Sequence, residues 1–308
     1  MKNKFFKLKI LFTLLISFIF TSNLFSKEIN FKAIEILTYD EGNTIVGNNE
    51  VEARIDNEVE IFADKITYKK DLEKLIAEGN VKAIDLINKI EIDSQEIIFF
   101  KKKNQIITSG KTFFKINEDY NGQSSDVHFY IDEKIIFSKK ISSFKDNLDN
   151  HIKAKSFRYS NNTQILKAND IKLIDNKKNK YFIKKGFLKT KENVLIGKDI
   201  KINLRNDSFG HPDNEPKLKG NSVIYENNKT LIKKGIFTSC KDNNDCPPWV
   251  ITSKEIIHDK NKKEIQYKNA WLKIYNIPVL YFPKFFHPDP SVDRKSGFLM
   301  PTFGESKN

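Results

Sequence analysis

A short motif that returns at nearly constant spacing is the feature that most constrains how this chain can fold. The motif is a small residue, two mostly polar residues, then an apolar residue that often precedes an aromatic one. Copies begin at Ala63, Ser94, Ser124, Ala154, Gly197 and Ser253. The first four are separated by 31, 30 and 30 residues, and the later two follow at wider spacings of 43 and 56. A unit of about 30 residues accommodates two strands of about ten residues with their turns.

Apolar and polar residues alternate with a period of two around the motif. The alternation is clearest in residues 77–83 and 268–274, and it places one face of a strand on a core and the other in water. Clusters of Asn, Asp and Lys at 69–71 and 175–179 are typical of turns. Stacked units that contact mainly their neighbours bury a continuous apolar interior. We therefore predict an all-β, elongated stack of antiparallel strands with open edges at both ends. The alternative is an ordinary β-sandwich with a coincidental repeat.

The first 26 residues have the pattern of a secretory signal peptide. They contain four lysines and no acid, followed by the apolar stretch 10–20 and a short polar end. The apolar stretch is short for a membrane span, which needs about 20 apolar residues. An uncleaved N-terminal anchor is the alternative. We expect an exported protein, in a compartment where disulfides can form.

The net charge is positive, with 53 Lys+Arg against 40 Asp+Glu, which gives +13. Removing residues 1–26 takes away four lysines and leaves +9. Of the basic residues, 49 are Lys and four are Arg, whereas proteins that read phosphates and bases favour the bidentate Arg side chain. We interpret the excess as a Lys-rich composition spread over solvated faces. A nucleic-acid groove is the less favoured interpretation, and we expect no nucleic-acid partner.

Motifs that carry catalytic or metal chemistry are missing from the sequence. The five histidines do not lie at metal-ligand spacing, and there is no P-loop, GxGxxG or GxSxG pattern. We therefore expect a protein that is not an enzyme and has no metal or cofactor. Cys240 and Cys246 are disulfide candidates, either with one another across a polar loop or with cysteines elsewhere.

The C-terminal third carries the most specific residues. They are 235–240 (GIFTSC), 246–251 (CPPWVI), 269–272 (NAWL), 277–283 (IPVLYFP) and 294–301 (RKSGFLMP). In this order they resemble the LptD (OstA) family of outer-membrane lipopolysaccharide-assembly proteins. The upstream repeat resembles the OstA-like periplasmic domain that this family shares with the bridge protein LptA.

The resemblance implies a fold, a location and a set of partners. It implies a signal peptide at 1–26, an OstA-like periplasmic β-jellyroll over 27–275, and over 276–308 the connection to a membrane β-barrel with its first strand region. The implied function is lipopolysaccharide transport and assembly at the outer membrane. The implied partners are lipopolysaccharide, LptA by edge-strand pairing, and the lipoprotein LptE inside the barrel. A membrane barrel needs at least about eight strands, so we expect these 308 residues to be part of a longer protein. The alternative is a natural protein that has no membrane barrel.

Candidate residues follow from the alternating positions and from chain order. The candidates for an apolar groove that shelters acyl chains are Ile61, Ile66, Tyr68, Ala77, Val81, Ala83, Phe157 and Leu166. The alternative for each is a place in an ordinary β-core. The candidates for the strand edge that meets the bridge protein are Phe31, Ile34 and Ile36. Two rival functions are a soluble periplasmic bridge of the LptA kind and a structural β-solenoid without a lipid ligand.

Overall fold

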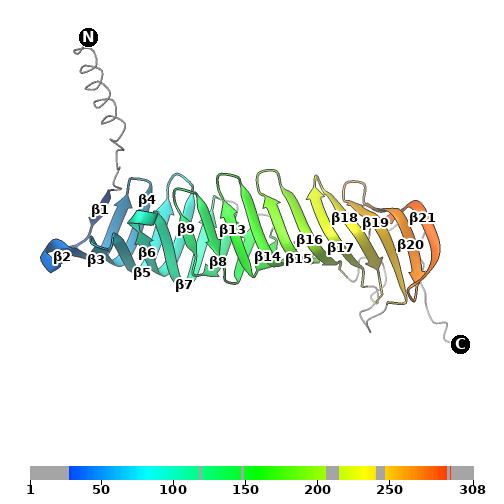
Figure 1. Ribbon diagram of the computed structural model, residues 1–308, viewed down its shortest axis with the longest axis horizontal. Coiled ribbons are helices and arrows are strands. Elements are labelled where there is room, and N and C mark those ends of the chain that lie inside the picture. The colour runs from blue at the N-terminus through cyan, green and yellow to red at the C-terminus, as the bar shows by residue number, and fades with distance from the viewer. Residues whose placement is uncertain are drawn as a thin grey trace, which may run out of the picture.

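The computed structural model describes residues 28–117, 120–146, 149–205, 215–240, 247–289 and 292. Within these residues the chain forms one continuous 21-stranded antiparallel sheet. Figure 1 shows the strands following one another along the long axis, from β1 at one end to β21 at the other. The predicted all-β fold of stacked antiparallel strands is confirmed.

The strands are of two kinds, long ones of 10 to 12 residues and shorter ones of three to six residues. The long strands are β3 (Thr44–Ile55), β4 (Val59–Lys69), β5 (Lys74–Asp85), β6 (Ile90–Phe100), β7 (Gln105–Ile116), β14 (Ile165–Ile174), β15 (Lys180–Lys189), β16 (Val194–Asn203), β17 (Lys217–Glu226), β18 (Lys229–Thr238), β19 (Trp249–Asp259), β20 (Glu264–Ile274) and β21 (Ile277–Pro288). The short strands are β1 (Ile29–Lys32), β2 (Glu35–Tyr39), β8 (Tyr120–Ser125), β9 (His128–Tyr130), β10 (Ile135–Ser138), β11 (Ser142–Asp146), β12 (His151–Ala154) and β13 (Ser156–Ser160). Two 3-10 turns, η1 (Asp40–Gly42) and η2 (Lys101–Lys103), join neighbouring strands.

Each long strand bends near its middle, and the bend explains the sequence repeat. In β4 the inward residues are 59, 61 and 63 before the bend and 66 after it, because the alternation skips one residue at a break in the pairing between Phe62 and Lys65. The motif therefore reads as a buried small residue, two outward polar residues at the corner, and the first buried apolar residue beyond it. A bulge that adds one residue produces such a change of phase.

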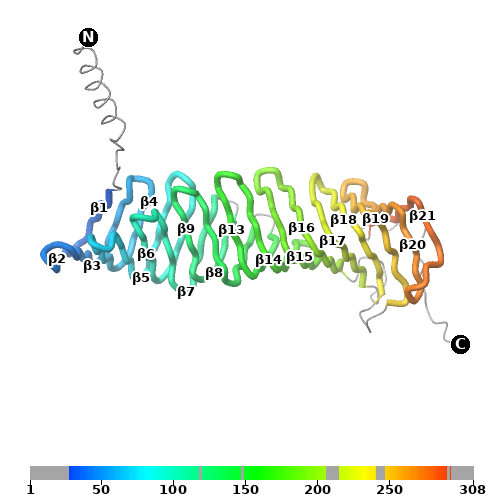
Figure 2. The backbone as a smooth tube through the Cα atoms, in the orientation of Figure 1, coloured from blue at the N-terminus to red at the C-terminus, as the bar shows by residue number. Residues whose placement is uncertain are grey.

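The corners line up and divide the sheet into two walls, which we call the first wall and the second wall, joined along a crease. In β4 the first wall is 59–63 and the second wall is 65–69, and pairing continues separately in each wall through β21. In the central repeats the corner interrupts the strand altogether, so that β7 pairs with β8 in the first wall and with β9 in the second. Figure 2 shows the chain running back and forth across the long axis as it advances along it.

The two walls face one another across a shared core. Phe114 in the first wall stacks on Phe157 in the second, with ring centroids 5.2 Å apart. The amide of Asn161, after β13, donates to the side chain of Asn88, after β5, at 3.2 Å. One buried hydrophobic cluster extends from Val51 to Ala270. The interior is therefore a continuous apolar layer enclosed by a folded sheet.

Asn-rich turns connect the strands where the sequence places its polar clusters. Asn227 and Asn228 both have positive φ, of 50° and 61°, in the two-residue turn between β17 and β18. Such a turn matches the twist of the strands it joins, and Asn tolerates this conformation better than most residues. The local sequence thus fixes the strand ends, while the bulges fix the corners.

One feature of the C-terminal end and one of the surface were not apparent from the sequence. The segment 277–288 is β21, which pairs with β20 at the edge of the described sheet, although it holds Pro278, Pro283 and Pro288. Proline is tolerated on an edge strand because its missing N–H need not pair. The lysines are also not evenly spread: β14 to β18 hold 13 Lys and three acids, whereas β3 to β6 hold five basic residues and nine acids.

The expected signal peptide and the segment 293–308 lie outside the described residues. In the part of the chain that the structure describes, no helix has the length and apolar character needed to cross a membrane.

Candidate functional site

The candidate groove residues all lie on the inner side of the folded sheet. Ile61, Ile66, Ala77, Val81, Ala83 and Phe157 are at most 3% exposed, and Tyr68 and Leu166 are half-buried against the same core. The candidates on β4 and those on β5 are neighbours, since Ile61 pairs with Ala83 and Ile66 with Ala77. Phe157 and Leu166 form a second group on β13 and β14. A water-excluded apolar layer of this kind is chemically suited to acyl chains, whose burial is worth about 0.8 kcal/mol per CH₂.

Aromatic side chains bridge the two walls at two places along the interior. In the middle, Phe144 meets Phe157 edge-on at 5.0 Å, and both contact Phe114. Near the C-terminal end, Phe237 in the first wall contacts Tyr267 in the second at 6.2 Å. In this conformation the walls are closed on their own side chains. An acyl chain could therefore enter only if these aromatic contacts part.

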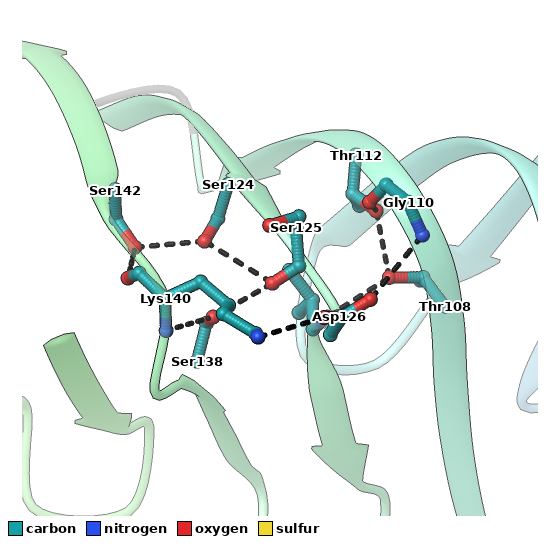
Figure 3. Close-up of polar contacts among 10 residues, drawn as sticks. Thr108, Gly110, Thr112, Ser124, Ser125, Asp126, Ser138, Lys140 and Ser142 are labelled. Atoms are coloured by element: carbon teal, nitrogen blue, oxygen red, sulfur yellow. Dashed lines mark hydrogen bonds and ion pairs between the residues drawn. The ribbon is translucent and has the colours of Figure 1, made fainter.

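A ladder of hydroxyl groups lines the crease in the central repeats, and the sequence reasoning missed it. Thr108 Oγ1 lies 2.6 Å from Thr112 Oγ1, and Ser124 Oγ lies 2.8 Å from Ser142 Oγ. Figure 3 shows these side chains meeting where the neighbouring strands break. Thr108 also accepts a hydrogen bond from the backbone N–H of Val127 at 2.9 Å.

The ladder satisfies backbone groups that the interrupted strands leave unpaired, and burial without partners would be costly. The signal in the sequence is the recurrence of Ser and Thr at corner positions in this stretch, at 108, 112, 124, 138 and 142. The interior is thus apolar along its walls and polar along the central part of its crease.

Two buried polar pairs stand at the C-terminal end. Tyr267 Oη and His287 Nε2 lie 2.9 Å apart inside the core, and His258 pairs with Asp289 just beyond β21. Burial lowers the pKa of His287, while the carbonyl of Pro288 and the charge of Asp289 act in the opposite direction. Burial also raises the pKa of the Tyr267 phenol. His287 is therefore held neutral near pH 7, and these contacts fasten the last strand to the stack.

The candidate docking residues lie at the opposite end. Phe31 in β1 is half-buried against the core, whereas Ile34 and Ile36 are 73% and 52% exposed. Within the described chain, β1 and β2 each pair with β3 alone, one in each wall. Their outer edges present backbone groups that another strand could pair with.

The remaining candidates are the two cysteines. Cys240 is half-buried after β18, and its N–H donates to Thr238 Oγ1 at 3.2 Å. Cys246 lies outside the described residues, so its pairing with Cys240 stays a prediction. Across the described ranges there is no group of three or more His, Cys, Asp or Glu side chains that could hold a metal ion.

Comparison with known proteins finds a local similarity. No family model matches the sequence. A stretch of 72 residues is 38% identical to the LPS-assembly protein LptD of Yersinia pestis bv. Antiqua (strain Antiqua), covering 23% of this chain and 9% of that protein. LptD of Sodalis glossinidius is 37% identical over 76 residues, with 25% of this chain and 9% of that protein covered. LptD of Salmonella typhi is 36% identical over the same number of residues.

Among solved structures, one match is LptH of Pseudomonas aeruginosa, described as the LptA homologous periplasmic component of the lipopolysaccharide transport device. It covers 46% of this chain and 82% of its own, with 12% identity and a TM-score of 0.22. At this TM-score the likeness adds nothing to the strand-by-strand description above. The comparisons thus establish that about a quarter of this chain is similar in sequence to LPS-assembly proteins of the LptD kind, over less than a tenth of their length.

Proposed function

We propose that this chain carries lipopolysaccharide in the periplasm toward the outer membrane, passing the acyl chains along the interior of the folded sheet. The observation that carries the proposal is the continuous water-excluded apolar layer between the two walls, with an unpaired strand edge at each end of the described sheet. The local similarity to LptD supports lipopolysaccharide as the lipid. On this proposal residues 27–275 act as the periplasmic part, and the later residues lead into the membrane part of a longer protein.

The mechanism needs no catalytic group. A lipid with several acyl chains loses about 0.8 kcal/mol per CH₂ that it exposes to water, so a covered path lowers the barrier to crossing the periplasm. For an acyl chain to enter, the two walls must separate along the side opposite the crease. The contact between Phe114 and Phe157 would then have to break. The Thr108–Thr112 contact joins the two walls at the crease while this happens.

A photo-crosslinking amino acid at Tyr68 in the full-length protein, in its native cell, tests the proposal. Tyr68 is aromatic and half-buried against the core, so a bulky aromatic analogue fits there. Phe62 is the matched control, since it lies on the same strand and faces outward. We expect lipopolysaccharide adducts from Tyr68 and few or none from Phe62. Equal adducts at both positions, or none at Tyr68 and Leu166, would contradict the proposal.

We further propose that the edge formed by β1 and β2 pairs with a periplasmic bridge protein of the LptA kind. The support is the position of Ile34 and Ile36 beside strands whose outer edges are open. The same photo-crosslinker at Ile36 should capture the bridge protein, whereas at Tyr281 on β21 it should not. Capture at Tyr281 alone would reverse the assignment of the two ends.

A further inference from the structure

The outer face of β14 to β18 is the most strongly charged part of the described chain. These five strands contain 13 lysines and three acids, a net charge of +10, and ten of the lysines are exposed. The mature chain as a whole is expected to carry only +9. The rest of the molecule is therefore close to neutral, and the basic character is a property of this surface.

The lysines are arranged in register with apolar side chains on the first wall. Lys172, Phe182, Lys201, Lys219 and Ile236 stand opposite one another on β14, β15, β16, β17 and β18. Neighbouring strands are about 4.8 Å apart, so this row extends over about 19 Å. It borders an open hollow of about 500 Å³ beside the crease, on the outside of the sheet.

A second hollow of about 480 Å³ lies on the outside of the second wall. Phe187 and Ile196 line it at 43% and 42% exposure, together with Lys198, Lys233 and Lys234. Lys234 borders both hollows, so the two form one surface that crosses the crease. Large apolar side chains between exposed ammonium groups form a surface that an anionic and partly apolar partner would complement.

The acids in the hollows do not cancel the charge. Asp170 pairs with Lys184 at 2.6 Å, and Asp199 is the other acid of the first hollow. Five lysines line the same hollow, which leaves a surplus of positive charge. Among the described residues, Lys172, Lys219 and Lys234 form no ion pair, while Lys233 stands opposite Glu255 of β19. A partner that supplies negative charge together with apolar contact would complement this surface.

We propose that the outer face of β14 to β18 binds the surface of an anionic phospholipid bilayer. Lysines contribute about 1 kcal/mol each near such a surface, and Phe or Ile side chains enter the boundary between headgroups and acyl chains. The choice of Lys over Arg favours a diffuse layer of phosphates over bidentate recognition of one phosphate or base. This site is on the opposite side of the sheet from the interior, and it does not depend on the function proposed for the interior.

Membrane contact through this face would hold the stack alongside a leaflet and leave the interior free. The N-terminal strands β3 to β6 carry a net charge of −4 and would be repelled from the same surface. The contact would therefore be made by the C-terminal half only.

Vesicle sedimentation with the mature chain from Lys27 tests the site. The test variant combines Lys172→Gln, Lys219→Gln, Lys233→Gln and Lys234→Gln, and the matched control combines Lys70→Gln, Lys89→Gln, Lys102→Gln and Lys103→Gln. Both change the net charge by the same amount at exposed positions. Circular dichroism checks that both retain their strands.

With vesicles containing 30% phosphatidylglycerol at low salt, we expect the test variant to bind about 100-fold to 1,000-fold more weakly than the unchanged chain. The control should lose less than about tenfold, since its lysines lie away from the surface. Phe187→Ser should weaken the binding that persists at high salt by about tenfold. Equal losses in the two quadruple variants, equal binding to neutral phosphatidylcholine vesicles, or binding to lipopolysaccharide without binding to phosphatidylglycerol would each overturn the proposal.

Discussion

The strands β3 to β6 and β14 to β18 follow the same pattern inside and differ outside. In both stretches each corner has outward polar residues between two buried ones, as in Ala63–Ile66 and Gly197–Ile200. The outer face of β3 to β6 has more acids than lysines and holds its lysines in pairs across strands, such as Lys82 with Glu91 at 3.2 Å. The outer face of β14 to β18 has a surplus of lysines with exposed Phe and Ile among them.

The difference shows which side of the sheet the fold constrains. Interior positions must fill a closed space, and close packing tolerates little change in volume there. Outer positions must only remain solvated, so one repeat can present an acidic face at one end and a basic, partly apolar face at the other. If this is correct, interior substitutions should cost stability in both halves, and outer ones should change binding with little effect on stability.

The largest effect is expected from Phe157→Ala. Phe157 contacts two other aromatic rings across the walls and is 3% exposed, so its loss leaves a cavity in the core. We expect the free energy of unfolding to fall by about 3–5 kcal/mol, measured by urea denaturation. The control Phe187→Ala removes the same ring from the outer face and should cost less than about 1 kcal/mol. Similar costs for the two would mean that the walls are not closed on each other.

Glycine-to-alanine substitutions at the crease should destabilise the fold by an intermediate amount. A Cβ at Gly220 would overlap Cγ2 of Ile232, a methyl group on the stiff β-branch of that side chain, and would lie 3.1 Å from the carbonyl oxygen of Lys233. A Cβ at Gly186 would meet only the flexible end of Ile171, its Cδ1, at 2.5 Å. Gly220→Ala should therefore cost about 1–3 kcal/mol, and Gly186→Ala less than about 1 kcal/mol, by the same measurement. The reverse order would show that the crease can move at Gly220.

Much of the interior could be predicted from the sequence because it depends on local alternation. The six candidates most deeply buried, among them Ile61 and Val81, were found from the period of two and from the repeat. What the repeat could not reveal was why two polar residues recur in it. That requires the bulge, a property of pairing between strands, which a single strand's sequence does not specify.

The parts that escaped prediction depend on contacts between segments or on position in the stack. The hydroxyls of Thr108 and Ser124 are needed because the strands break there, and the break is set by the neighbouring repeat. Pro278 and Pro283 fit β21 because it is the last strand of the described sheet, with one free edge. The basic face was obscured because the total charge averages over two halves of opposite sign.

The local stability of the fold should depend on pH most strongly at the C-terminal end. Burial lowers the pKa of His287 in the folded chain below its unfolded value of about 6.5. Its contribution is therefore fully present above pH 6.5 and is lost as the pH falls below that value, because the unfolded chain takes up the proton first. We expect the hydrogen-exchange protection factors of β20 and β21, in which the intrinsic pH dependence of amide exchange is divided out, to fall between pH 7 and pH 5.

His287→Gln should reduce this pH response, since the amide can still meet Tyr267 but does not titrate. His151→Gln on β12, where the histidine is exposed, serves as the control and should leave the response unchanged. Burial also lowers the pKa of His128, so part of a global pH effect comes from β9. A loss of protection that is uniform along the stack would contradict a local origin at His287.

The smallest effect on stability and the most selective one on binding are expected from Asp170→Asn. Asp170 sits at the crease with φ of 48°, a conformation that Asn also tolerates, so the backbone is preserved. Its ion pair with Lys184 is exposed, and exposed pairs contribute little to stability. The free energy of unfolding in urea should therefore stay almost unchanged. Binding to phosphatidylglycerol vesicles should instead strengthen about fivefold, because one negative charge leaves the basic face.

The matched change on the other half is Glu78→Gln, which removes the acid partner of Lys65 in an equally exposed pair at 3.5 Å. It adds the same charge to the chain, so a purely global electrostatic attraction would raise vesicle binding in both variants alike. If only Asp170→Asn strengthens binding, the outer faces of the two halves act independently while their interiors share one set of packing constraints. If both do, the apparent division of the outer surface is only a difference in composition, and the charge that matters is that of the whole chain.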